Sequence, residues 1–134
     1  MYRIALFLSL VSAAAHACAV EQNSTVSSQT AGSISYPTVE AATSALRAKA
    51  GVRMREENDW LVFADPSEDA FWSITTPANP AHPTMVKRRL VEQNGEVKLL
   101  LAARCGAPKP VCDQVVQRFR DDGEAIAKSL RAKR

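Results

Sequence analysis

The Asn94-Gly95 pair, within the run TMVKRRLVEQNGEVKLLLAAR, is the feature that most constrains the fold of this chain. Both positions of a two-residue hairpin turn need positive φ, which asparagine and glycine adopt readily, and apolar residues alternate on either side of the pair. A loop of this length also sets the register of the two strands. It pairs Gln93 with Glu96, Leu90 with Leu99 and Arg88 with Leu101. The run therefore predicts a long antiparallel β-hairpin.

Alternation along this hairpin predicts a core face and an outer face, because successive side chains of a strand point in opposite directions. The core face carries Val86, Leu90, Val97, Leu99, Leu101 and Ala103. The outer face carries the cations Lys87, Arg89 and Lys98, with Val91 and Leu100 between them. Such a face is suited to an acidic protein or to an anionic envelope polymer, such as a glycan or the phosphates of lipopolysaccharide. The alternative is that these cations protect outer strands from aggregation.

Three shorter segments ahead of the hairpin also have strand patterns. VRMREE and DWLVFAD are expected to pair through Glu57 and Asn58, and a turn is expected at residues 65–68. In the third segment, AFWSITT, Trp72 and Ile74 share one face while Phe71 points to the other.

One helix is expected before these strands and one after them. Thr38 suits the N-cap of the first helix and Gly51 its end. The second begins near Pro110, continues past Gly123, which is expected to loosen its middle, and ends in a basic tail. Its apolar stripe comprises Cys112, Val115, Val116, Phe119, Ile126 and Leu130. These patterns predict a single α+β domain over residues 36–134, an antiparallel meander sheet of about four or five strands packed on one face by an N-terminal and a C-terminal helix.

Residues 1–19 have the pattern of a secretory signal peptide. Arg3 provides a positive charge, residues 4–11 are apolar, and small residues up to Ala19 offer cleavage sites. The apolar run is far shorter than the roughly 20 residues that span a bilayer. Residues 20–35 are rich in serine and threonine and predict a flexible tether. We therefore expect a periplasmic or secreted protein, or one that is lipid-anchored in the cell envelope.

Charge and composition exclude several function classes. Loss of residues 1–19 removes one of the 17 basic residues and none of the 14 acidic ones, so that the net charge becomes +2. This charge is too small to indicate binding to nucleic acid. Calcium-loop, Walker and dinucleotide glycine patterns are absent from the sequence, and no cofactor is expected.

The three cysteines fit an exported protein. Cys105 and Cys112 are expected to form a structural disulfide, because oxidising compartments favour such bridges and the spacing is not the Cys-x-x-Cys of redox proteins. Cys18 lies in the cleavage region. It is either removed with the signal or becomes the lipid-bearing N-terminus of a lipoprotein, although Ala15 stands where such motifs usually have leucine. Lipidation of Cys18 would be the one expected attachment to a membrane.

His82 is the one histidine that remains once the signal is removed, and it lies in the proline-rich run TTPANPAHP. Three prolines cannot donate to a strand ladder, so this run is expected to leave the sheet as a stiff loop. A zinc site would need further ligands, which disulfide-bonded cysteines do not provide, and no metal is expected. No Gly-x-Ser-x-Gly elbow accompanies the histidine, so no catalytic residue is assigned.

The run FWSITTPANPAHPTMVKR, residues 71–88, resembles a segment of an uncharacterised family of small exported proteins of Gram-negative bacteria. In that family an aromatic-Ser/Thr-x-Thr-Pro segment precedes Pro-Ala-His-Pro and a basic strand. The resemblance brings no activity with it. It implies that Trp72 and His82 belong to a shared feature, and we include both as candidate binding residues.

The function expected from the sequence is that of an exported envelope protein that binds another macromolecule through the basic sheet face. An inhibitor or immunity-type role would suit its size, its disulfide and its export. One alternative is a small hydrolase of envelope polymers that uses His82 and a nearby carboxylate. Another is a structural lipoprotein anchored through Cys18. Binding is preferred to catalysis because no catalytic motif is present.

Overall fold

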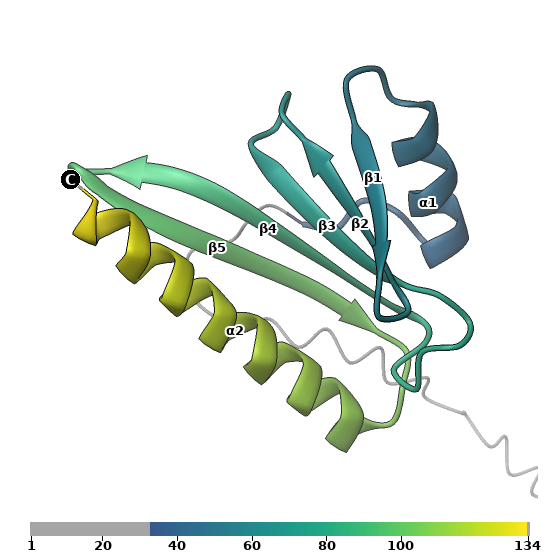
Figure 1. Ribbon diagram of the computed structural model, residues 1–134. Helices are drawn as coiled ribbons and strands as arrows, with labels where there is room; N and C mark the ends of the chain where they lie inside the picture. The colour runs from purple at the N-terminus through teal and green to yellow at the C-terminus, as the bar shows by residue number, and fades with distance from the viewer. Residues whose placement is uncertain (1–32, 134) are drawn as a thin grey trace, which may run out of the picture.

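A computed structural model describes residues 33–133 of the chain. Its elements are, in chain order, α1 (Val39–Ala48), β1 (Arg53–Glu57), β2 (Trp60–Asp65), β3 (Ala70–Thr75), β4 (Thr84–Gln93), β5 (Glu96–Cys105) and α2 (Lys109–Ala132). The strands form one antiparallel sheet in the order β1-β2-β3-β4-β5, as Figure 1 shows. The α+β class and the meander are therefore confirmed. The predicted signal peptide, Cys18 and most of the predicted tether lie outside the described residues.

Helix α1 begins at the predicted N-cap. The hydroxyl of Thr38 accepts a hydrogen bond of 3.1 Å from the amide of Ala41, which satisfies one of the free amides of the first turn. The chain leaves the helix before Gly51, which has a φ of +79°, a conformation that glycine adopts without steric cost. The buried residues of α1 are Val39, Ala42 and Leu46.

Both tight hairpins turn on residues with positive φ. The Asn-Gly turn between β4 and β5 has φ values of 55° and 75°, and the two strands pair in the predicted register. The turn between β1 and β2 lies one residue later than expected, since Glu57 pairs with Trp60. Asn58 and Asp59 form it, with φ values of 50° and 62°. Asparagine and aspartate tolerate this conformation better than glutamate does, which explains the shift.

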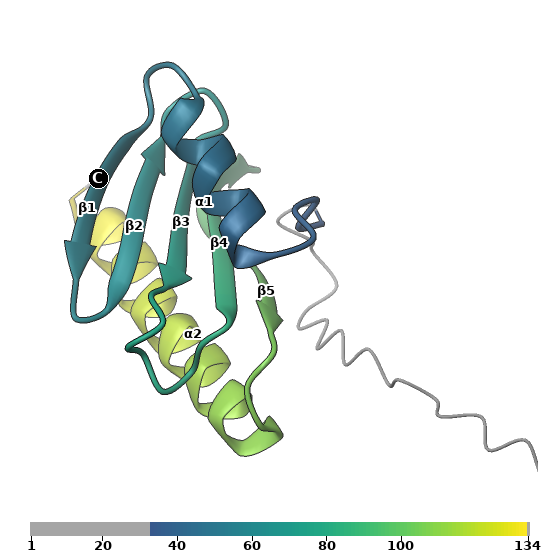
Figure 2. The same cartoon turned by 90° about the vertical axis from the view of Figure 1, so that its right-hand side faces the viewer.

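The two helices cover opposite faces of the sheet, which corrects the expectation that both cover one. Helix α1 packs against the face that carries Phe63, Trp72 and Ile74, and α2 brings Phe119 against Val62 on the other face. Figure 2 shows α1 in front of the sheet and α2 behind it. The reason lies in β2 and β3, where buried residues occur on both faces. A strand that is apolar on both faces needs cover on both.

Helix α2 turns a different stripe to the sheet in its second half. The stripe is buried as predicted at Phe119, but Ile126 is 40% exposed. Gly123 and Ala127 take the inward positions instead. A Cβ atom at Gly123 would lie 2.7 Å from Cδ2 of Leu99, so the absent side chain is what lets α2 approach β5 closely. Gly123 does not interrupt the helix.

Strands β4 and β5 are longer than the others, with 10 residues each against five or six in β1, β2 and β3. The end of this hairpin, residues 90–99, extends past Arg89, the last residue of β4 that pairs with β3. We call it the hairpin arm. Figure 1 shows that it projects beyond β1–β3 and α1, with α2 running alongside it.

Candidate binding surfaces

Two cations of the predicted binding face, Lys87 and Arg89, bind to the turn between β2 and β3. The Lys87 side chain is 11% exposed, and its ammonium lies 2.6 Å from a carboxylate oxygen of Glu68. The same ammonium lies 4.9 Å from the centre of the Trp72 ring, within cation–π distance. Arg89 donates from Nε to the backbone carbonyl of Glu68 at 3.1 Å. These contacts make both cations part of the fold.

Lys49, at the end of α1, completes this charged network by binding the carboxylates of Asp65 and Glu68. The hydrogen bond from Lys87 is the main reason why the pKa of Glu68 is lowered, and Lys49 adds to it. Burial acts to raise the pKa of Asp65, but hydrogen bonds from Lys49 and Ser67 outweigh burial and the pKa is lowered. The hydrogen bond to Asp65 raises the pKa of Lys49. Lys49, Asp65 and Glu68 are therefore all charged near neutral pH.

Lys98 is separated from the other two cations. Lys98 pairs with Val91, which lies two residues after Arg89 on β4, so its side chain is on the same face as Lys87 and Arg89. It belongs to the hairpin arm, however. Its ammonium donates to the side-chain oxygen of Gln93 at 3.4 Å. The structure therefore divides the predicted basic face into an internally bound part and one cation on the arm.

Trp72 is a core residue. Its side chain is 3% exposed and lies beneath the ring of Tyr36, with the two ring centres 5.3 Å apart. Its indole Nε1 is buried and has no hydrogen-bond partner among the described residues. Tyr36 and Lys87 cover this ring, so Trp72 is not accessible to a macromolecular partner.

His82 contributes to the folding of the proline-rich loop. Its Nδ1 lies 3.1 Å from the hydroxyl oxygen of Thr75 and 3.3 Å from the carbonyl oxygen of the same residue. Because a carbonyl oxygen only accepts, a proton on Nδ1 satisfies both contacts. His82 interacts electrostatically with the carboxylate of Glu40, which is exposed at the start of α1. No hydrogen bond joins the two side chains among the described residues.

The proline-rich loop itself is organised by Asn79. The side-chain oxygen of Asn79 accepts from the amide of Ala81 at 2.9 Å, and its side-chain nitrogen donates to the carbonyl of Asp59 at 3.3 Å. The amide of Gly106 donates to the carbonyl of Pro83 at 2.7 Å. The loop is therefore held to the β1–β2 turn on one side and to the segment after β5 on the other, and the His82–Pro83 peptide bond within it is cis.

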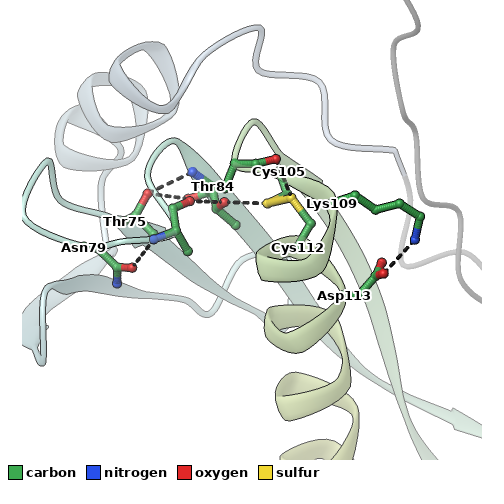
Figure 3. The surroundings of a disulfide bond; sticks show 9 residues. Thr75, Asn79, Thr84, Cys105, Lys109, Cys112 and Asp113 are labelled. Atoms are coloured by element: carbon green, nitrogen blue, oxygen red, sulfur yellow. Dashed lines mark hydrogen bonds and ion pairs between the residues drawn. A yellow bond between two sulfur atoms is a disulfide. The ribbon is translucent and has the colours of Figure 1, made fainter.

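The disulfide between Cys105 and Cys112 is present, with the two Cα atoms 5.8 Å apart. Figure 3 shows it beside Thr84, whose hydroxyl oxygen lies 3.0 Å from the Cys105 sulfur. The same hydroxyl donates to the carbonyl of Ala81 in the proline-rich loop. The bridge joins the last residue of β5 to the first turn of α2, and so it fixes the start of α2 against the sheet.

A groove of about 660 Å³ runs between β5 and the second half of α2. It is lined by five consecutive residues of β5, 97–101, which means that it borders the edge of that strand as well as one face. On the helix it reaches Phe119, Gly123 and Ala127. The charged residues of its lining are Lys98, Arg120, Glu124 and Arg131.

A second cavity, of about 200 Å³, lies between α2 and the sheet face that α2 covers. Its lining comprises Arg55, Glu57, Asn58, Trp60, Val62, Ser73, Arg88, Arg118, Phe119 and Asp122. Neither this cavity nor the groove includes His82 or Trp72 in its lining. The structure therefore does not bring these two candidate residues to either concave surface.

Arg88 could have drawn attention to the second cavity from the sequence. It stands between Val86 and Leu90 on the alternating core face of the hairpin, where a cation is unusual. The groove had a weaker signal, because the last strand of a meander has a free edge by construction. No local pattern indicates that a helix lies beside that edge.

Searches of family models, of curated proteins and of solved structures find no match to this chain. The resemblance over residues 71–88 thus stays a prediction. The described residues contain no group of three or more potential metal ligands. None of the helices in the described part of the chain is long and apolar enough to cross a membrane.

Proposed function

We propose that this protein is a non-catalytic exported protein that binds an extended acidic segment of an envelope protein along the edge of β5. An inhibitor or immunity-type role is one form that such binding would take. The observation that carries the proposal is the groove between β5 and α2, because it places a free strand edge, an apolar wall and several cations together.

The two edges of the sheet differ in how well they would accept another strand. Strand β1 is exposed along its whole length, and four of its five residues are charged. Charged, short edge strands of this kind discourage pairing with other chains. Strand β5 has 10 residues, is half-buried along most of its length and carries Val97 and Leu99 to Leu101. It pairs with β4 alone among the described strands.

An added strand would gain hydrogen bonds from the backbone of β5 and apolar contacts from the groove. Backbone pairing provides affinity in this mode of recognition, and side-chain pockets provide specificity. Lys98, Arg120 and Arg131 outnumber Glu124 in the lining, which favours an acidic segment. Of the three cations of the predicted basic face, Lys98 lines the groove and is part of the proposed site, whereas Lys87 and Arg89 do not line it.

Export of the protein is supported by two observations of different kinds. Residues 1–19 have a signal-peptide pattern, and the structure contains a disulfide of the sort that oxidising compartments maintain. A partner in the cell envelope would share that compartment.

Site-specific photo-crosslinking in the native envelope tests the proposed groove. A photoreactive phenylalanine derivative at position 124, on the exposed side of the groove, should form adducts with one acidic protein. The same derivative at position 47, on the exposed side of α1, should not.

Charge reversal in the groove then provides the matched comparison. The double substitution Lys98→Glu with Arg131→Glu should abolish the adducts, whereas Arg47→Glu with Arg53→Glu, two exposed cations outside the groove, should leave them intact. Adducts that survive the groove substitutions would contradict the proposal. Adducts with the mass of two copies of this chain would replace it with self-association.

A further inference from the structure

Arg88 is a half-buried cation whose charge is incompletely compensated. It is half-buried on the sheet face that α2 covers, and its guanidinium lies over the ring of Phe119 at 5.0 Å. Its Nε is fully buried and has no hydrogen-bond partner among these residues. A buried donor left unpaired is unfavourable, and more so when it is charged.

The electrostatic surroundings of Arg88 do not neutralise it. Burial lowers the pKa of its guanidinium, the nearby charge of Asp122 acts in the opposite direction, and Arg55 adds to the lowering. Asp122 exerts this effect without forming an ion pair with Arg88 in the described structure. The buried Nε of Arg88 can therefore donate to one more acceptor.

The other charged residues of the cavity define what that acceptor is. Arg55 is 3.2 Å from Glu57 and the two largely cancel each other. Arg118, on the helix side, has no ion pair within the described residues. The lining thus combines three guanidinium groups with two carboxylates, which leaves an excess of one positive charge. A single negative charge matches this excess better than a doubly charged phosphate does.

The size and walls of the cavity agree with a small planar group. Its volume of about 200 Å³ lies below the usual range of pockets for drug-sized ligands, roughly 300 to 1,000 Å³. Trp60 and Phe119, whose rings meet edge to face with centres 5.3 Å apart, both line it. Planar guanidinium groups bind carboxylates with two parallel hydrogen bonds.

We propose that the cavity between α2 and strands β1–β4 is a carboxylate-binding site, with Arg88 as the buried anchor and Arg118 as the accessible second donor. The carboxylate belongs either to a free small acid or to an acidic side chain of a partner. This inference does not depend on the proposed function, because the cavity and the β5 groove are separate sites. Phe119 is the single residue that lines both.

The test is a titration of the full mature protein at pH 7, followed through the Nε–H resonance of Arg88 in proton–nitrogen NMR spectra. Sodium acetate and glutamate should shift this resonance in a saturable manner, and inorganic phosphate at equal ionic strength should bind more weakly. Arg118→Gln should weaken binding about tenfold, since a charge-assisted hydrogen bond is lost. Lys128→Gln, an exposed cation of the same helix that lines neither the cavity nor the groove, should change binding less than twofold.

The source of the carboxylate is distinguished by a second pair of probes, the capped peptides Gly-Glu-Gly and Gly-Gln-Gly. Tighter binding of the glutamate peptide than of free glutamate assigns the site to a partner's side chain, and the reverse order assigns it to a free acid. Absence of any saturable shift, equal shifts with the glutamine peptide, or stronger binding of phosphate would each overturn the proposal.

Discussion

The consecutive cations Lys87, Arg88 and Arg89 meet different environments on the two faces of the sheet. On the α1 face, Lys87 and Arg89 are held by Glu68, and Lys49 extends the network to Asp65. On the α2 face, Arg88 rests on Phe119 with an unpaired Nε. Adjacent residues of a strand thus serve different purposes: the α1 face uses its charges for stability, and the α2 face leaves charge available for a ligand.

The largest expected effect concerns the packing that supports the α2 face. Phe119→Ala removes the side chain that contacts Trp60 and Arg88, and it should reduce the free energy of unfolding by about 3 to 4 kcal/mol. Ile126→Ala on the same helix should reduce it by less than about 1 kcal/mol, because Ile126 is 40% exposed. Urea denaturation measures both. Similar losses in the two variants would contradict the stripe observed in α2.

The disulfide gives the next largest effect, and it acts on the α2 side. Replacing Cys105 and Cys112 together by serine should lower the free energy of unfolding by roughly 2 to 3 kcal/mol, because the unfolded chain gains conformational freedom. Thermal denaturation with and without a reductant provides the measurement. A wild-type protein insensitive to reductant under conditions that fully reduce the bridge would contradict this expectation.

A matched pair of substitutions tests the comparison of the two faces directly. Lys87→Met leaves Glu68 with a weaker set of partners and removes the cation from Trp72, which should cost about 1 to 2 kcal/mol of stability. Arg88→Met removes a half-buried cation whose Nε has no hydrogen-bond partner, so stability should change by less than about 0.5 kcal/mol or increase. Urea titrations without added carboxylate measure both. A larger loss for Arg88→Met would show that its charge stabilises the fold.

The smallest expected effect is a loss of folding stability at low pH, which arises from the carboxylates on the α1 face. The pKa values of Asp65 and Glu68 are lowered by folding, so their contribution is complete above the unfolded values near about 4 and is lost as pH falls below them. Solvent screening at the exposed partners keeps this contribution modest. Urea midpoints measured between pH 6 and pH 3 should fall less steeply in Asp65→Asn than in the wild type. Parallel curves would contradict the assignment.

Much of the fold follows from local patterns of residues. The Asn94-Gly95 turn fixes the β4–β5 register because its two residues permit positive φ, and Thr38 sets the start of α1 by capping it. The disulfide pair could also be recognised, because an exported protein favours such a bridge and the spacing of Cys105 and Cys112 is not that of redox proteins. The β1–β2 turn was misplaced by one residue because Glu57, Asn58 and Asp59 are all polar, and pattern alone does not rank them.

The candidate sites were less accessible to sequence reasoning. Lys87 and Arg89 were correctly placed on one face, but the presence of Glu68 beside them depends on a turn between two other strands. Ile126 fits the apolar period of α2, yet Gly123 and Ala127 take the inward positions, and Gly123 lies close to Leu99 of β5. Both outcomes depend on neighbours that are distant in sequence.

By itself the sequence determined the order of the elements, the register of the long hairpin and the face on which each residue of that hairpin lies. These properties depend on backbone conformation and on a period of two residues, which are local. The tertiary structure alone decided that α1 and α2 cover opposite faces, and hence that Lys87 is bound internally while Arg88 borders a cavity. The face that each helix covers depends on contacts between residues that are distant in the sequence. Buried residues on both sides of β2 and β3 require cover on both faces of the sheet.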